Sequence, residues 1–197
     1  MKILLVGALH AETLPVRRRL GLVGARRLAT GDWLGLQIAL LRCGVGPARA
    51  ERRTREALKR FDADLVLSFG TCGSLVDELG LGTVVELASV RARGGEPRRL
   101  GERGVHCVTV KRGVFDPRER AELAALGCQV CEMEAHAVMM AAGDRRFRGL
   151  KVVSDFASAP PSRLGFGLHA WRLSAAVLAP ALEDFLEDET KALLTRL

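Results

Sequence analysis

The chain has 197 residues, 48% of them hydrophobic, and a mean hydropathy of +0.12, which together exclude a disordered or fibrous protein. A chain of this length can bury one substantial core, so we expect a single domain over residues 1–197. The 30 basic and 23 acidic residues leave a net charge of +7, but the arginines are scattered and aromatic residues make up only 5%. We therefore expect a solvated basic surface and no nucleic-acid partner.

The first half of the chain alternates between apolar runs and helical patterns. Residues 2–8 form a near-continuous apolar run, typical of a strand covered on both faces, and a helix can begin within residues 12–20. Residues 36–44 predict a second strand that ends in glycine, and a helix is predicted over residues 47–61 with a proline at its first position. Residues 64–75 predict a strand that runs into a glycine-rich turn.

The second half continues this alternation around one long polar stretch. Residues 82–90 predict a strand, and residues 91–104, rich in glycine and arginine, predict a long exposed loop. Asp116 is expected to cap a helix over 116–127, with Glu119 as the capping-box acid. The remaining expectations are strands at 105–110, 128–134 and 150–155, a buried helix at 135–143, and an amphipathic helical tail from 171 to 197 that Pro180 interrupts.

Strands that alternate with helices favour an α/β fold, here a three-layer sandwich with a central mixed, mostly parallel sheet flanked by helices. Ligands of such folds bind beyond the carboxyl ends of the strands. A single acid at a strand end is most often a helix cap, but several polar groups on one edge predict a pocket. The polar groups that follow predicted strands are Glu12, Thr71, Ser74, Glu134 and Asp155.

Such a set of acids suits the cleavage of an N-glycosidic bond. Breaking the bond between a ribose carbon and a base nitrogen develops positive charge on the sugar and negative charge on the leaving base. One acid must protonate the base, a second must activate the attacking group, and a carboxylate near the sugar hydroxyls stabilises the oxocarbenium-like state.

The N-terminus and the cysteines indicate the cellular setting that we expect. Residues 1–12 contain no signal-peptide pattern, and no apolar run approaches the ~20 residues that span a bilayer. The five cysteines lie mostly in or beside apolar runs, which predicts a reduced, cytoplasmic protein. Cys128 and Cys131 have C-x-x-C spacing without a second pair, so we interpret them as apolar filler and expect neither a metal nor a cofactor.

Four segments resemble the nucleoside phosphorylase and nucleosidase superfamily, and within it the 5′-methylthioadenosine/S-adenosylhomocysteine nucleosidases. They are "GVGPARAE", "SFGTCGSLVDELGLGTVV", "CEMEAHAV" and "VVSDFAS", in this order and after a first strand that Glu12 follows. The resemblance covers residues 1 to about 159. It implies the nucleoside phosphorylase-like fold, a small-molecule purine nucleoside as ligand, and a homodimer.

The resemblance also assigns expected roles to individual residues. It implies that Asp155 donates a proton to purine N7 with Ser154 beside it, and that Glu12 activates water. It implies that Glu134 binds the ribose hydroxyls while Met133 packs on the sugar. The remaining expected pocket residues are Thr71 and Gly70, which hold the water, Phe115 against the base, and Val45 with Gly46 along the wall.

The choice between water and phosphate depends on Ser68. Related phosphorylases place an arginine two residues before the glycine of the corresponding loop, where this chain has Ser68, so a phosphate dianion lacks a bidentate partner. We therefore expect a purine nucleosidase acting on an adenosine-type nucleoside, either methylthioadenosine-like or with a bulkier 5′ group. A phosphate-dependent phosphorylase and a non-catalytic nucleoside-binding homologue stay open as alternatives.

The departures of the chain from the family pattern include two residues and one stretch. Lys151 stands where the family usually has arginine, and the stretch before the "EME" segment is short. His136 occupies a position that is usually small, and on an apolar helix it is more often a core residue than a catalytic one.

Overall fold

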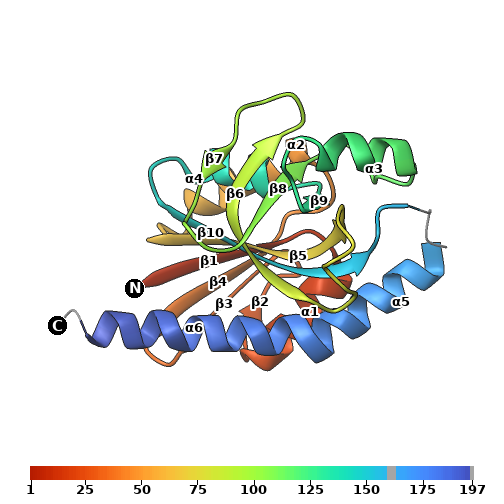
Figure 1. The fold of residues 1–197 in the computed structure, drawn as a ribbon. Coiled ribbons are helices and arrows are strands. Elements are labelled where there is room, and N and C mark those ends of the chain that lie inside the picture. The colour runs from red at the N-terminus through yellow and green to blue at the C-terminus, as the bar shows by residue number, and fades with distance from the viewer. Residues whose placement is uncertain (159–162, 196–197) are drawn as a thin grey trace.

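The computed structural model describes residues 1–158 and 163–195, and within them one sheet with helices around it (Figure 1). The strands are β1 (Lys2–Gly7), β2 (Val23–Gly24), β3 (Leu28–Trp33), β4 (Leu36–Arg42), β5 (Leu65–Ser74), β6 (Val84–Ala92), β7 (Arg98–Arg99), β8 (Val105–Thr109), β9 (Val130–Glu132) and β10 (Arg146–Asp155). The helices are α1 (His10–Arg19), α2 (Pro47–Leu58), α3 (Pro117–Ala124), α4 (Ala135–Ala142), α5 (Arg163–Leu173), the π-helical segment η1 (Ser174–Leu178) and α6 (Ala179–Leu194).

The sheet is built around β5. This strand pairs in parallel with β1 and β10 and antiparallel with the short β9, and β1 pairs in parallel with β4. Because β10 also pairs with β6, the strands β5, β10, β6, β8 and β9 close into a ring, from which β1, β4, β3 and β2 extend as an open sheet. The carboxyl ends of β1, β4, β5 and β10 therefore meet at one edge.

Helices cover both faces of the open part of the sheet (Figure 1). Successive side chains of a strand point to opposite faces, so Ile3 and Leu5 of β1 pack with α1, η1 and α6, whereas Leu4 and Val6 pack with α2 and α4. Burying a side chain of this size stabilises the fold by about 1.5–3 kcal/mol. The expected three-layer arrangement with a mixed sheet flanked by helices is confirmed.

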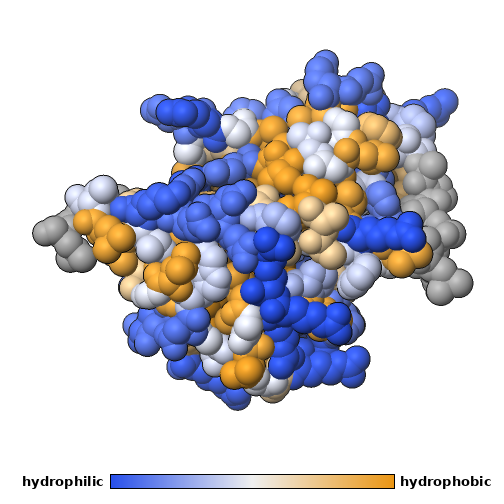
Figure 2. All heavy atoms as spheres, turned by 90° about the horizontal axis from the view of Figure 1, so that it is seen from below, coloured by the Kyte–Doolittle hydropathy of each residue, from blue (hydrophilic) through white to orange (hydrophobic). Residues whose placement is uncertain are grey.

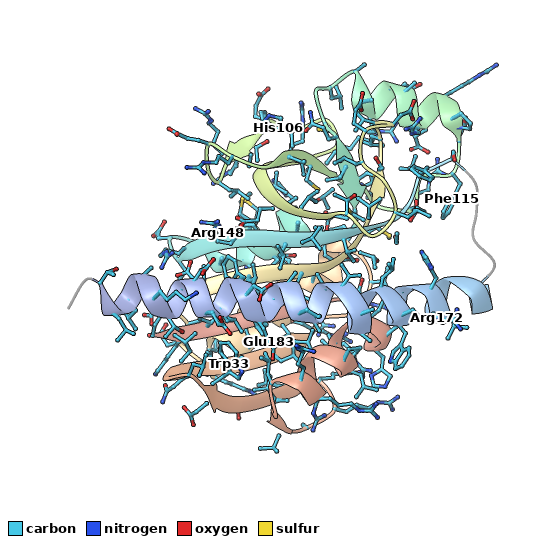
Figure 3. The ribbon with its side chains drawn as sticks, turned by 60° about the horizontal axis from the view of Figure 1, so that its bottom comes forward. Trp33, His106, Phe115, Arg148, Arg172 and Glu183 are labelled. Atoms are coloured by element: carbon cyan, nitrogen blue, oxygen red, sulfur yellow. The ribbon has the colours of Figure 1, made fainter. Side chains whose placement is uncertain are left out.

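The C-terminal tail crosses the sheet as one long helical rod made of α5, η1 and α6 (Figure 3). Pro180 lies in the first turn of α6, directly after the π-helical turn. Contrary to the prediction, it does not interrupt the rod. A proline has no N–H to donate to the preceding turn, and this loss is tolerated at the first turn of a helix. The rod is tied to α1 by the ion pair between Arg19 and Glu183.

Two predicted boundaries around the glycine-rich segments are wrong. Thr71 and Ser74 lie within β5 and not in a turn, because β9 and β10 pair with this part of the strand. The predicted strand at 128–134 is shorter, since β9 ends at Glu132 and Glu134 already stands at the start of α4.

Two further predictions need correction, and one strand was not predicted. Residues 91–104 are less irregular than expected, because β6 continues to Ala92 and β7 pairs back onto it. Asp116 caps α3 as predicted by accepting from the N–H of Arg118, but Glu119 pairs with Arg93 and Arg112 and is no capping-box acid. The strand β3 was not predicted, because its sequence "LATGDW" lacks an apolar run.

The surface and the cysteines agree with the composition. Figure 2 shows hydrophilic residues over much of one face, with apolar areas between them. All five cysteines are buried and free, including Cys128 and Cys131. Within residues 1–158 and 163–195, every helix is too short or too polar to cross a bilayer.

Candidate active site

A pocket opens at the edge where β1, β5 and β10 end. Its volume is about 230 Å³, slightly below the ~300–1,000 Å³ that is usual for ligand pockets, so it suits a small molecule. The residues that line it are Ala8, Leu9, Glu12, Val45, Thr71, Cys72, Gly73, Val110, Gly113, Val114, Phe115, Cys131, Glu132, Met133, Glu134, Ser154 and Asp155.

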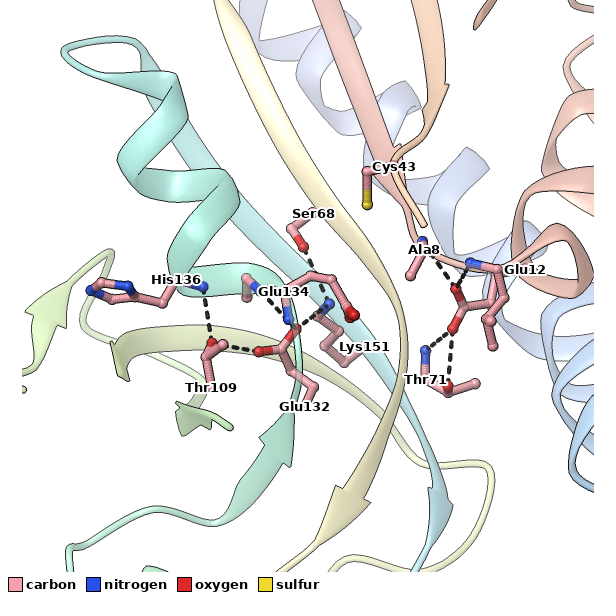
Figure 4. A network of polar contacts seen from close by, with 12 residues as sticks. Ala8, Glu12, Cys43, Ser68, Thr71, Thr109, Glu132, Glu134, His136 and Lys151 are labelled. Carbon is pink, nitrogen blue, oxygen red and sulfur yellow. Dashed lines mark hydrogen bonds and ion pairs between the residues drawn. The ribbon is translucent and has the colours of Figure 1, made fainter. Parts of the chain in front are cut away.

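Glu12 lies at one end of the pocket, in the first turn of α1, and is 3% exposed. Its Oε2 accepts the backbone N–H groups of Ala8 and Leu9, at 3.2 and 2.8 Å. Its Oε1 accepts the N–H and the hydroxyl of Thr71, each at 2.9 Å (Figure 4). Four donors thus fix a carboxylate between the end of β1 and the middle of β5.

The backbone at Gly70 explains why the Glu12 carboxylate fits there. Gly70 has φ +147°, and a Cβ on it would lie 2.9 Å from Glu12 Oε1. Gly70 itself does not line the pocket, but its missing side chain makes room for the acid that does.

Asp155 lies at the other end of the pocket, at the last position of β10. Its Oδ2 accepts the hydroxyl of Ser154 at 2.8 Å, and its Oδ1 accepts the N–H of Ala157 at 2.9 Å. The pairing of β10 with β5 is irregular here: Val153 faces Cys72 and Asp155 faces Gly73, so β10 carries one extra residue. Such a bulge re-aims a side chain at the end of a strand.

Glu134 lines the same pocket, at the residue that precedes α4. Its Oε1 accepts the N–H of Gly46 at 2.7 Å, which brings the loop after β4 against the start of α4. Burial raises the pKa of Glu134 to about 8, and the neighbouring carboxylate of Glu132 adds to this effect. The Gly46 N–H and the Lys151 ammonium oppose the rise.

The apolar walls come from Met133, Val45 and Phe115. Phe115 is 41% exposed and Val45 40%, so both lie at the mouth. Phe115 belongs to the segment that leads into α3 (Figure 3), and a Cβ on Gly113 would lie 2.4 Å from its ring. The Phe115 ring therefore packs so closely on Gly113 that the side chain of any larger residue there would collide with it.

The structure brings most of the sequence-predicted residues together, whereas Ser74 does not line the pocket and its hydroxyl donates to the carbonyl of Val76. The eight that line one pocket are Glu12, Val45, Thr71, Phe115, Met133, Glu134, Ser154 and Asp155, while Gly46 and Gly70 lie behind its wall against Glu134 and Glu12. His136 does not line the pocket; its ring points away from Glu132 and Glu134 (Figure 4). Burial and then Arg98 lower the pKa of this half-buried histidine.

Sequence reasoning gave little weight to Glu132 and Lys151, which form a buried ion pair at 3.2 Å beside the pocket. The two residues are 19 positions apart and lie on β9 and β10. A charged residue inside the apolar run "LKVVS" was the available signal, because a lysine that is buried must have an acidic partner.

The family model of the phosphorylase superfamily matches residues 4–118. A 5′-methylthioadenosine/S-adenosylhomocysteine nucleosidase of Bacillus velezensis is 30% identical over 96 residues, which cover 46% of this chain and 42% of that protein. The chain thus matches less than half the length of this curated relative.

Solved structures show the same fold. Futalosine hydrolase of Helicobacter pylori gives a TM-score of 0.85 at 15% identity, covering 95% of this chain and 98% of that one. The 5′-methylthioadenosine/S-adenosylhomocysteine nucleosidase of Neisseria meningitidis, in complex with methylthio-immucillin-A, gives 0.74 at 20% identity, covering 93% and 99%. Because the family model covers more than half of the sequence and the fold agrees, this chain belongs to the phosphorylase superfamily.

Proposed function

We propose that the protein is a purine nucleosidase that hydrolyses the N-glycosidic bond of an adenosine-type nucleoside. The observation that carries this proposal is the convergence of Glu12, Glu134 and Asp155, from three separate elements, on one pocket. The similarity to proteins named 5′-methylthioadenosine/S-adenosylhomocysteine nucleosidase and futalosine hydrolase supports it.

Asp155 is proposed as the general acid. The Ser154 hydroxyl and the Ala157 N–H hold its carboxyl group at the pocket wall, where it can protonate N7 of a purine. Protonation neutralises the charge that develops on the leaving base, which lowers the barrier to bond cleavage.

Glu12 is proposed to activate the attacking water. A carboxylate offers about four lone-pair positions, and four donors already occupy them. Of these donors, the Thr71 hydroxyl can rotate, whereas the three backbone N–H groups are fixed. When the Thr71 hydroxyl rotates away, the water donates a hydrogen bond to Oε1 in its place. The rotated hydroxyl then lies next to this water.

Glu134 is proposed to bind the ribose hydroxyls, with Met133 as the apolar floor under the sugar. The Gly46 N–H holds Oε1, and among the described residues no donor contacts Oε2, which leaves this oxygen for the sugar. A ribose with two adjacent hydroxyl donors matches such an acceptor. Because the pocket is small and Phe115 and Val45 lie at its mouth, a 5′ substituent extends outward.

The charge of the pocket favours water over phosphate. Four of the lining residues are acidic, and no lysine or arginine is among the lining residues that the structure describes. The ammonium of Lys151 is committed to Glu132 and to the hydroxyl of Ser68, both at 3.2 Å. A phosphate dianion would enter a site that repels it.

The deciding experiment uses a panel of nucleosides with and without phosphate. The purified protein is incubated with methylthioadenosine, S-adenosylhomocysteine, futalosine, adenosine and inosine, and the free base and sugar products are separated by chromatography. We expect release of the base and a free sugar in phosphate-free buffer. Release that requires phosphate means a phosphorylase, and binding without release means a non-catalytic homologue.

We also propose that the chain forms one domain, as its length predicts, and that the protein is a homodimer, as the resemblance implies. Light scattering coupled to size-exclusion chromatography measures the mass directly. A mass equal to that of one 21.3 kDa chain would contradict this part of the proposal.

A further inference from the structure

A buried ion pair lies at the wall of the pocket, which Glu132 lines and Lys151 does not, and the proposed chemistry does not use it. Lys151 of β10 and Glu132 of β9 have side chains that are only 3% and 2% exposed, and their charged atoms are 3.2 Å apart (Figure 4). Lys151 does not line the pocket, so its ammonium does not touch a bound molecule. A lysine that is fully removed from water needs a reason beyond packing.

Glu132 connects this lysine to the start of α4. Its Oε2 accepts the N–H groups of Glu134 and Ala135, at 2.9 and 2.7 Å, in addition to the Lys151 ammonium. Its Oε1 accepts the Thr109 hydroxyl at 2.5 Å. A carboxylate at a helix N-terminus satisfies N–H groups that have no partner within the helix.

Thr109 completes the connection. Its hydroxyl oxygen accepts the N–H of His136 at 3.0 Å, while its O–H donates a hydrogen bond to Glu132. Three successive N–H groups, those of Glu134, Ala135 and His136, are thus held by Glu132 and Thr109. The backbone position of Glu134 thus depends on the Glu132 carboxylate, which the Lys151 ammonium contacts.

We propose that Lys151 is a positioning residue which, through Glu132, fixes the start of α4 so that Glu134 presents one carboxylate oxygen to the sugar. This inference rests on the proposed function for the role of Glu134. The hydrogen bonds to the backbone stand independently of that role.

The same arrangement governs the ionisation of Glu134. The charged or titratable groups that face it are Glu12 from α1, Cys43 after β4, Glu132 from β9 and Lys151 from β10. Burial raises the pKa of the Cys43 thiol to about 12, so this group stays neutral. The carboxylates disfavour the charged form of Glu134, and Lys151 favours it.

The test compares Lys151→Met, Glu132→Gln and the double variant with the wild type. The dissociation constant of methylthio-immucillin-A is measured by calorimetry from about pH 5.5 to about pH 9. Relative to wild type, Lys151→Met should move the pH at which binding strengthens upward by about one unit, or about tenfold in affinity at intermediate pH. Glu132→Gln should move it downward, and the double variant, which removes both charges, should return it close to wild type.

Lys151→Arg serves as the conservative variant, because it retains the positive charge and should keep the wild-type pH dependence. A purely structural role of Lys151 would instead weaken binding equally at every pH. Curves that superimpose overturn the inference, and so does a constant loss of affinity without faster hydrogen exchange at the amides of Glu134, Ala135 and His136. If Lys151→Met does not fold, the downward shift in Glu132→Gln and its reversal in the double variant still decide it.

A second readout needs no ligand. Hydrogen exchange at the amides of Glu134, Ala135 and His136 should be about tenfold or more faster in Lys151→Met than in wild type, while exchange in α2 stays unchanged. Unchanged exchange at the three amides overturns the inference even if the protein is not a nucleosidase. A wild type that neither cleaves nor binds nucleosides, with faster exchange in the variant, would contradict the proposed function and leave the positioning role of Lys151 supported.

Discussion

The carboxylate of Glu12 accepts both the N–H and the hydroxyl of Thr71, at 2.9 Å each, across 59 positions of sequence. This contact joins the helix after the first strand to the middle of the central strand. It fixes the acid that the proposed reaction requires for activating water.

Replacing Glu12 with glutamine should reduce kcat by about 10²–10⁴-fold with little change in KM, because the amide cannot take a proton from water. Release of the base from methylthioadenosine, followed under saturating conditions, measures this loss. Glu102→Gln is the matched control, since Glu102 is exposed and lies outside the pocket. If Glu12→Gln kept the activity of the control variant, Glu12 would not be the residue that activates the water.

Asp155→Asn should lower kcat for a purine nucleoside by a similar factor, about 10²–10⁴-fold, because the leaving base no longer receives a proton. A nitrophenyl riboside has a leaving group that needs no protonation, so its hydrolysis should be affected far less. The ratio of the two losses is the measurement. Equal losses for both substrates would mean that Asp155 has another role.

Gly70→Ala should abolish most of the activity by displacing Glu12. The new Cβ would lie 2.9 Å from Glu12 Oε1, at a backbone φ of +147° that alanine rarely adopts. A shift of about 1 Å in a catalytic group costs about 10²-fold in rate. Gly101→Ala is the control, because its Cβ would have no neighbour closer than 4.0 Å. Comparable kcat values for the two variants would argue against a fixed Glu12.

Gly113→Ala should act on binding instead. The added methyl group would lie 2.4 Å from the Phe115 ring, which must then move from the mouth of the pocket. We expect KM to rise about tenfold with kcat changed much less, and the same Gly101→Ala protein is the reference. A loss confined to kcat would show that Phe115 contributes to the chemical step.

The raised pKa of Glu134 predicts how stability depends on pH. The unfolded chain releases this proton near pH 4.5, whereas the folded chain keeps it up to about pH 8. The folded state therefore binds more protons in this window, and its free energy of unfolding falls as the pH rises through it. Relative to Glu134→Gln, which is neutral throughout, the wild type should lose roughly 2–4 kcal/mol between about pH 5 and about pH 9. Urea unfolding of both proteins at several pH values measures the difference, and parallel curves would contradict it.

Much of the candidate site follows from the sequence because its acids stand next to apolar strands. Glu12 and Asp155 were predicted from their positions after β1 and in β10, and parallel pairing through β5 brings these strand ends to one edge. The ion pair of Lys151 with Glu132 was not predicted, since it requires β9 and β10 to be neighbours of the same strand. Long-range closure of this kind leaves no periodic signal in a single sequence.

The placement of Thr71 within β5 shows the same limit. Glycines at 70 and 73 favour a turn by local propensity, but pairing with β9 and β10 extends the strand through them. Pairing with β9 and β10 stabilises the extended backbone of this segment more than its glycines disfavour it.

The extra residue in β10 between Val153 and Asp155 has a consequence for how this protein can change. Before the bulge, each residue of β10 faces inward or outward according to the alternation that the core requires. The extra residue shifts this alternation by one position, so Asp155 points to the face opposite to Val153, whereas regular pleating would place both on the same face. Residues of β10 up to Val153 therefore follow the alternation that the core requires, and Asp155 follows a shifted one. Loss of the extra residue would therefore turn Asp155 to the other face of the sheet, whereas substitutions that keep the length of β10 leave its direction unchanged.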